Sequence, residues 1–307
     1  MLKSFIHTFL KDGTMKVYFG FLLLMAWTVF GYENPHQPTL IGGQIAQKDD
    51  FPELIYISSG RSRCSAAIVS SRVILTAAHC IENEGEIFPA DFVVNQQAFR
   101  AKCTHHPDYA SKYSFDFALC KTKKDIDVKP ASIGSEPVSI GQQITLTGFG
   151  CTQPRRPDGS QDPGGNDGKL RYGLSPVVRL PENSPAGGYQ YFYTESNTAL
   201  CFGDSGSAAM EKILNPKTDP HIIVGTNSRG NIRTLSLLSS TFLPGFQNWG
   251  KAWAIANQVD ICGLTKDCES KPEPKCSREK QKIKEWQKRL EQCQQSNAET
   301  TDDIIEL

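Results

Sequence analysis

From residue 40 to about residue 262 the chain repeats one pattern, in which short runs of β-favouring residues alternate with turn-forming residues. Examples of these runs are SAAIVSSRVILTAA, QQITLTGFG and HIIVGTNS. Many short strands at this spacing are typical of an all-β sandwich or barrel. The 25 glycines and 18 prolines among 307 residues also suit a loop-rich β protein better than a helical bundle. We therefore predict an all-β fold, with length for one large domain or two smaller ones.

The charges of the chain balance. Lysine and arginine together number 33, aspartate and glutamate also number 33, and the net charge is zero. This balance does not indicate the basic surface that attracts nucleic acid. We expect no nucleic-acid partner.

The N-terminal region contains an uncharged apolar stretch, VYFGFLLLMAWTVFG at residues 17–31, directly after Lys16. This stretch is too short to span a bilayer comfortably, and small residues near its end suit a cleavage site. We predict a signal peptide over residues 1–31, with Met15 as a possible true start, and no stable membrane anchor after cleavage. The alternative is a single N-terminal anchor. The expected destination is the exterior or the periplasm.

Ten cysteines are present, an even number. In an exported protein such a count indicates a disulfide framework, whereas in a reducing cytosol it would indicate metal or redox chemistry. A zinc site formed by Cys103, His105 and His106 is the weaker alternative. The remaining histidines, including His221, belong to no motif that we identify.

One long turn-forming stretch lies at residues 151–170. It contains four oxygen-bearing side chains that suit calcium, those of Asp158, Asp162, Asn166 and Asp167. Their spacing matches no calcium-loop template, so a solvated surface loop is the favoured interpretation.

Residues 263–307 differ in character from the rest. A proline-containing linker precedes CSREKQKIKEWQKRLEQCQQ, which is charged and favours a helix. Its apolar residues and cysteines fall on one stripe at heptad-like spacing. We expect this stripe either to dock on the protein's own barrel or to bind a partner as a coiled coil. Cys276 and Cys293 would lie about 25 Å apart on a straight helix and cannot bond each other. We expect their partners to include Cys262 and Cys268, or another chain.

The segment CFGDSGSAAM places an acid directly before Ser205 and glycines on both sides. A serine hydroxyl is a poor nucleophile near neutral pH until a base takes its proton. Upstream, VILTAAHC places His79 after an apolar strand, and SFDFALC places Asp116 before another. We predict that His79 is the base, that Asp116 orients it, and that the N–H groups of Gly203 and Ser205 receive the oxyanion.

The motifs TAAHC, DFAL and CFGDSGS, with IGG near residue 41, closely resemble the trypsin/chymotrypsin family of serine endopeptidases. They occur in the family's order, and the resemblance covers residues 40–262. It implies two six-stranded antiparallel β-barrels of the trypsin-like type. It also implies peptide-bond hydrolysis through an acyl-enzyme, on protein or peptide substrates, without a cofactor or metal. The alternative is a protease-like binding or adhesion module with little or no activity.

The resemblance also suggests how the cysteines pair. We expect the disulfides Cys64–Cys80, Cys103–Cys120 and Cys151–Cys201. The family bridges the pair that matches the first. Antiparallel strands on either side of Asp116 would bring the second pair together. The strand after Ser205 lacks the usual partner of Cys201, and the loop carrying Cys151 lies beside the pre-serine segment in the family.

In this family a freshly cut N-terminus pairs with the acid before the nucleophile, which orders the oxyanion loop. The matching residues are Leu40 and Asp204, so residues 32–39 form a short propeptide. One departure is Thr39, which replaces the usual arginine or lysine before the cut. We therefore expect an activating protease without trypsin-like specificity.

The substrate pocket is also inferred by position. The resemblance places Ala199 and Leu200 at its base, and Ser228, Arg229 and Gly230 along its wall. Because no acid lies in these segments, an arginine or lysine of the substrate would be buried unpaired. We expect a neutral, apolar or small residue before the scissile bond. Arg229 replaces the family's tryptophan, and we expect it to repel basic residues or favour acidic ones further along the substrate.

Overall fold

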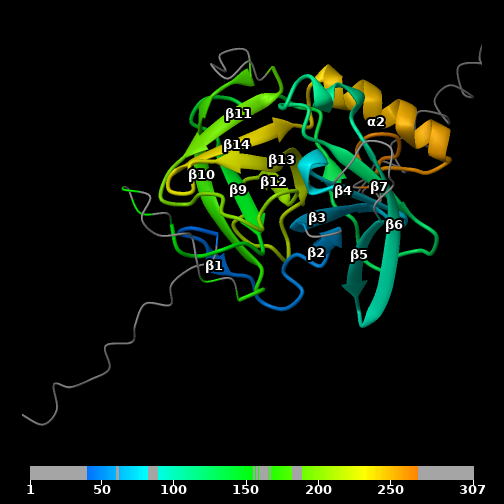
Figure 1. Cartoon of the computed structure of the whole chain (residues 1–307), viewed down its shortest axis with the longest axis horizontal. Coiled ribbons are helices and arrows are strands. Elements are labelled where there is room, and N and C mark those ends of the chain that lie inside the picture. The colour runs from blue at the N-terminus through cyan, green and yellow to red at the C-terminus, as the bar shows by residue number, and fades with distance from the viewer. Residues whose placement is uncertain are drawn as a thin grey trace, which may run out of the picture. The chain divides into compact units, whose positions relative to one another are not determined.

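A computed structural model describes residues 40–268, with gaps at 60–61, 82–88, 155, 157, 159–164, 166 and 182–188 (Figure 1). Every described residue belongs to one compact unit, residues 38–307. The predicted signal peptide, the predicted propeptide and the helical tail from residue 269 lie outside the described residues. Among the described residues, no helix has the length and apolar character needed to cross a bilayer.

The first barrel is closed and built entirely from antiparallel pairs. Its strands, in the order in which they pair around the barrel, are β2 (Leu54–Ser59), β3 (Ser62–Ser70), β4 (Val73–Thr76), β7 (Ala118–Thr122), β6 (Gln97–His105) and β5 (Pro89–Val94). Buried and exposed residues alternate along β6, because successive side chains of a strand point to opposite faces. Ile57, Ile68 and Ile74 are among the residues that fill the interior.

The second barrel also closes, because β9 pairs with β10 at the ends of the sheet. Its strands, in pairing order, are β9 (Gln143–Gly148), β10 (Arg171–Arg179), β11 (Tyr191–Glu195), β14 (Leu235–Ser240), β13 (Ile222–Gly230) and β12 (Ala208–Glu211). Two short strands add to it, β1 (Gln44–Ile45) beside β10 and β8 (Ser132–Ile133) beside β13. The prediction of two six-stranded antiparallel barrels is confirmed.

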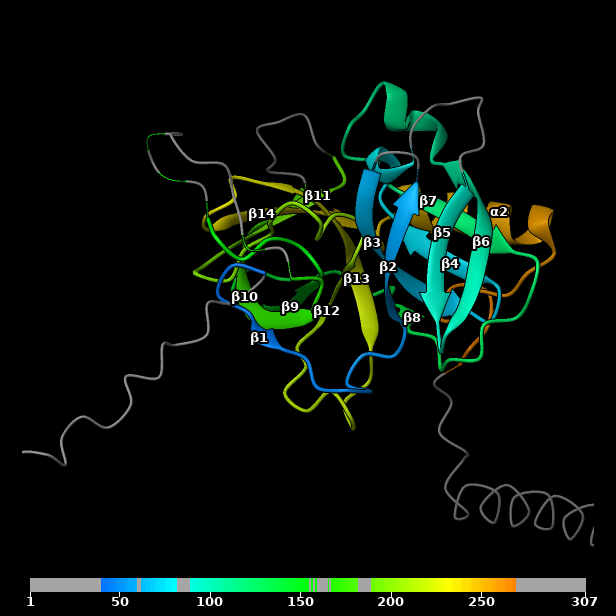
Figure 2. The ribbon, with the colours of Figure 1, turned by 60° about the horizontal axis from the view of Figure 1, so that its bottom comes forward.

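A shared hydrophobic cluster joins the two barrels. Figure 2 shows the strands of the two barrels from a second direction. The cluster contains Leu75 and Phe117 from the first barrel and Met210 and Ile223 from the second. Burial of apolar surface contributes the dominant favourable free energy of folding. Its burial in this cluster holds the two barrels against each other.

One helix, α2 (Pro244–Asn257), corrects the expectation that strands continue to residue 262. Pro244 lies in its first turn, where a missing N–H costs nothing. Phe246, Gly250, Trp253 and Ala254 form its buried face at helical spacing. The helix packs this face into the shared cluster.

Four disulfides join cysteines of the described residues: Cys64–Cys80, Cys103–Cys120, Cys151–Cys201 and Cys262–Cys268. The first three are the pairs suggested by the resemblance. The fourth overturns the expectation that Cys262 and Cys268 bond the tail cysteines, because a turn closed by Ile261 and Thr265 brings their Cα atoms to 5.2 Å. Cys276 and Cys293 lie outside the described residues.

Neither alternative for metal binding gains support from this structure. Cys103 is bonded to Cys120, so the zinc site with His105 and His106 is excluded. Of the loop residues considered for calcium, Asp167 is paired with Arg171, and Asp162 and Asn166 lie outside the described residues.

Candidate active site

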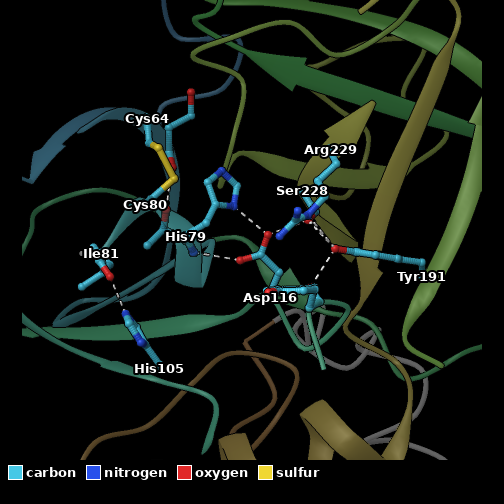
Figure 3. A network of polar contacts seen from close by, with 12 residues as sticks. Cys64, His79, Cys80, Ile81, His105, Asp116, Tyr191, Ser228 and Arg229 are labelled. Atoms are coloured by element: carbon cyan, nitrogen blue, oxygen red, sulfur yellow. Dashed lines mark hydrogen bonds and ion pairs between the residues drawn. A yellow bond between two sulfur atoms is a disulfide. The ribbon is translucent and has the colours of Figure 1, made fainter. Parts of the chain in front are cut away.

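His79 and Asp116 come together because their strands pair. His79 lies on the short turn η1 (Ala78–Cys80) directly after β4, and Asp116 lies two residues before β7. Strands β4 and β7 are antiparallel neighbours, with Thr76 opposite Ala118. As a result, Nδ1 of His79 lies 2.7 Å from Oδ2 of Asp116, and the backbone N–H of His79 donates to Oδ1 at 2.9 Å (Figure 3).

Asp116 is fully buried and receives a further hydrogen bond. The hydroxyl of Ser228 donates to Oδ2 at 2.5 Å. Burial acts to raise the pKa of Asp116, but the hydrogen bonds and charge of His79, together with Ser228, hold that pKa below its ordinary value. The carboxylate is therefore ionised at neutral pH and can stabilise a positively charged imidazole.

Ser205 lies in a tight turn between the barrels. Its carbonyl accepts from the N–H of Ser65 at 2.7 Å, which ties the turn to β3 of the first barrel. Gly206 follows with a φ of +81°, and a Cβ there would lie 2.1 Å from the hydroxyl of Thr76. Only glycine fits this close approach.

Ser205 and His79 line one cavity of about 480 Å³. Within the part of the chain that the structure describes, no hydrogen bond joins the Ser205 hydroxyl to His79. Catalytic hydrogen bonds are often long without substrate and tighten when substrate binds. The shared cavity is therefore the structural link between the two residues.

The backbone N–H groups of Gly203 and Ser205 are free to receive an oxyanion. Gly203 has a φ of +102°, and its carbonyl accepts from the hydroxyl of Ser65 at 2.7 Å. Neither Gly203 N–H nor Ser205 N–H has an acceptor among the described residues. The Cys151–Cys201 disulfide and a Cys151 N–H bond to the Phe202 carbonyl at 2.9 Å pin this segment.

The cavity lining extends beyond the residues inferred from the sequence. It comprises Arg63, Cys64, His79, Leu200, Cys201, Phe202, Gly203, Ser205, Ser228, Arg229, Gly230 and Ile232. Ala199 does not belong to this lining and is fully buried. No sequence motif had indicated Arg63, Phe202 or Ile232 as lining residues. Arg63 precedes Cys64 and Phe202 follows Cys201, and these expected disulfide cysteines were a signal that could have identified the first two.

A chain of polar contacts connects Asp116 to Arg229. The hydroxyl of Tyr191 lies 3.0 Å from that of Ser228 and donates to the Tyr113 carbonyl at 2.7 Å. Nε of Arg229 donates to the Tyr191 hydroxyl at 3.1 Å (Figure 3). Tyr191 was not a candidate from the sequence, because it lies in no motif.

The comparisons with known proteins agree with this geometry. The family model described as Trypsin matches residues 40–231, which is more than half of the chain. The chain belongs to the trypsin family. Members of this family are serine-type endopeptidases, and their substrates are proteins or peptides.

Individual relatives of this trypsin-family chain are distant. Serine protease SP24D of Anopheles gambiae is 25% identical over 190 residues, which are 56% of this chain and 67% of that protein. Granzyme M of Rattus norvegicus is 26% identical over 151 residues, or 44% of this chain and 58% of that protein. Serine protease 1 of Canis lupus familiaris is 24% identical over 155 residues, which are 45% of this chain and 60% of that protein. The matches thus span about three fifths to two thirds of these relatives.

In this trypsin-family chain Asp204 is a buried acid beneath the cavity. Its two carboxylate oxygens accept from the N–H groups of Gly150 and Cys201, each at 2.7 Å. Burial raises its pKa to about 7, although these two bonds and the charge of Arg171 act in the opposite direction. A Cβ on Gly148 or Gly150 would lie 2.0 or 2.6 Å from Oδ1 of Asp204, so the acid requires glycine at both positions.

Leu40 is also completely buried, within the core of the second barrel. The carbonyl of Ile41, its neighbour, accepts from the N–H of Ala199 at 2.9 Å, which places the segment beside the residues before Ser205. In the full chain the nitrogen of Leu40 is a peptide nitrogen bonded to Thr39, so it carries no charge.

Proposed function

We propose that the protein is an exported serine endopeptidase that cleaves peptide bonds with Ser205, His79 and Asp116. The observation that best supports this proposal is the 2.7 Å contact between His79 Nδ1 and Asp116 Oδ2, beside a cavity that His79 and Ser205 both line. No cofactor is needed for this chemistry.

Each residue of the proposed site has one role. His79 takes the proton of Ser205 as the hydroxyl attacks the substrate carbonyl, and then gives that proton to the leaving amine. Asp116 keeps the imidazole in the right tautomer and balances its charge. The free N–H groups of Gly203 and Ser205 bind the oxyanion. Water then hydrolyses the acyl-enzyme by the same proton path in reverse.

The proposed enzyme is a zymogen. Removal of residues 32–39 would give Leu40 a charged amine, which can pair with Asp204. The burial of Asp204 without an ion-pair partner among the described residues supports this step, because a buried carboxylate is costly until a cation arrives. Thr39 before the cut points to an activating protease that does not require a basic residue.

The proposed substrate preference is a neutral, apolar or small residue before the scissile bond. No carboxylate belongs to the described lining of the cavity, whereas Leu200, Phe202 and Ile232 do. A substrate arginine or lysine would find no countercharge there. Export to the exterior or the periplasm is supported by four disulfides, which persist in oxidising compartments.

A fluorophosphonate probe tests the catalytic assignment. Protein processed to begin at Leu40 should be labelled at Ser205, and the Ser205→Ala variant should not be. Peptide hydrolysis should fall by a factor on the order of a million in that variant. If folded, processed protein takes no label and cuts no peptide library, the binding or adhesion alternative replaces this proposal.

A further inference from the structure

Arg229 is a cation held in place at the cavity. It lies near the end of β13, is exposed, and belongs to the cavity lining. Its Nε donates to the buried Tyr191 hydroxyl at 3.1 Å, and its guanidinium lies 5.1 Å from the centre of the Tyr113 ring. Two anchors on different elements therefore hold the side chain, which reduces the entropy lost when it binds a ligand.

The charge of Arg229 is not neutralised by an ion pair in the described part of the chain. The negative charge of Asp116 attracts the Arg229 guanidinium from a distance, but that carboxylate is already hydrogen-bonded to His79 and Ser228. The only hydrogen bond that the Arg229 side chain makes within the described residues is the one from Nε. The terminal nitrogens of the guanidinium are left to bind a carboxylate, which suits their fork geometry.

A second arginine, Arg63, lines the same cavity. Arg63 is exposed, and its side chain has no hydrogen-bond or ion-pair partner among the described residues. It directly precedes Cys64, and Figure 3 shows Cys64 and Arg229 on opposite sides of His79. Two arginines therefore lie around the proposed nucleophile, and no carboxylate lines the cavity with them.

We propose that this groove selects acidic peptide segments, with Arg229 binding a carboxylate upstream of the scissile bond and Arg63 binding one downstream. The assignment of sides rests on the proposed function. Arg229 follows Ser228 on the wall assigned to residues before the scissile bond. Arg63 adjoins Cys64, which is bonded to Cys80 beside His79. Because His79 would protonate the leaving amine, we assign Arg63 to residues after the bond. The neutral residue next to the cut and the acidic residues around it occupy different parts of the groove, so the two preferences are compatible.

Binding to an inactive protein tests this inference directly. The probes are alanine-based peptides with one leucine before the intended cut and a single glutamate, or its neutral isostere glutamine, scanned through the other positions. Their Kd values would be measured on processed Ser205→Ala protein at low ionic strength. We expect glutamate to bind more tightly than glutamine, on the order of fivefold, at one upstream and one downstream position. Added salt should reduce the difference.

Variants in that background assign each effect. Arg229→Gln should abolish only the upstream preference, and Arg63→Gln only the downstream one. Arg100→Gln is the matched control, because Arg100 is exposed but paired with Asp91 and outside the cavity lining. Melting curves would show that each variant is folded. Arg229→Lys should retain part of the preference, because lysine keeps the positive charge but lacks the fork geometry of the guanidinium.

Equal affinities for the glutamate and glutamine peptides, or no binding of the acidic peptides, would overturn the inference. A loss of preference in Arg100→Gln as large as in the groove variants would also overturn it, since general charge would then be the cause. These outcomes are separate from failure of the proposed function. Binding is measured without catalysis, whereas the proposed function depends on labelling and hydrolysis by the protein that retains Ser205.

Discussion

The hydroxyl of Ser228 lies 2.5 Å from Oδ2 of Asp116, the same oxygen that lies 2.7 Å from Nδ1 of His79. The second barrel, which carries Ser228, therefore contributes directly to a histidine–aspartate pair built by the first. Ser228 touches neither the proposed nucleophile nor the proton that moves, so it acts as a positioning residue.

Replacing Ser228 by alanine should lower kcat/KM on the order of tenfold, because a buried carboxylate oxygen loses a charge-assisted donor. The acid side of the pH–rate profile should also change, since the Asp116 pKa rises when that donor is lost. Ser239→Ala is the control. Its hydroxyl is buried and has no partner among the described residues, so its removal should change activity little. Equal losses in both variants would contradict the positioning role.

Asp204 should make the uncut protein less stable as the pH rises. Its pKa is raised to about 7 in the folded chain from an ordinary value of 3.8, so the folded state holds a proton that the unfolded state has released. Stability from this group is present below pH 4 and is lost as the pH rises towards 7 and above, by a few kcal/mol. Urea unfolding of the uncut chain between pH 4 and pH 8 measures this.

Two comparisons make that experiment decisive. Asp204→Asn should flatten the decline, because the amide does not ionise. Protein cut before Leu40 should lose much less stability over the same range, because the new amine offers the carboxylate a cation. A pH profile that Asp204→Asn leaves unaltered would show that another group is responsible.

His221 and Glu53 form an ion pair that links the two barrels. Nδ1 of His221, at the residue before β13, lies 2.7 Å from Oε1 of the buried Glu53, which precedes β2. Burial acts to lower the pKa of His221, but the hydrogen bond and charge of Glu53 raise it above 6.5. The contribution to stability is therefore complete below about pH 6.5 and is lost as the pH rises through the raised value.

His221→Phe should remove this contribution while keeping the stacking on Phe51, whose ring lies 4.9 Å away. We expect the free energy of unfolding to fall by about 1 kcal/mol at pH 6, and by less at pH 9. Chemical denaturation at the two pH values checks this. An equal loss at both would mean that packing, rather than charge, is affected.

The Cys151–Cys201 disulfide should matter for catalysis as well as for stability. It closes a loop with a sequence separation of 50 residues, worth about 4 kcal/mol in a chain-entropy estimate. It also pins the segment that presents the Gly203 N–H. Replacing both cysteines by serine should therefore lower kcat more than KM changes. The matched control is the double serine variant of Cys262 and Cys268, a pair outside the cavity lining, which should cost stability but leave kcat nearly unchanged.

The local sequence was sufficient for the fold class. Alternating apolar residues and turn formers predict strands because side chains of a strand point to opposite faces, and this pattern is visible within a few residues. The motif around Ser205 and those around His79 and Asp116 are equally local. The resemblance that they carry predicted the two barrels, which the structure confirms.

Other features depend on segments that meet only after folding. Helix α2 was missed because its glycines and its short apolar runs suit a strand as well, and the helix is selected by packing Phe246 and Trp253 into the shared core. Cys262 and Cys268 were assigned to the tail, since a sequence does not show that a turn brings them together.

The contacts that extend the candidate site are all long-range. Ser228 and Asp116 are 112 residues apart, and Arg229 and Tyr191 are 38 apart. The sequence by itself determined the strand pattern and supplied the residue types for the chemistry, because both are properties of short segments. Which side chains meet around Asp116, and which arginines line the cavity, was decided by strand order and register, because hydrogen bonds require atoms within about 3 Å and only the folded barrels bring them that close.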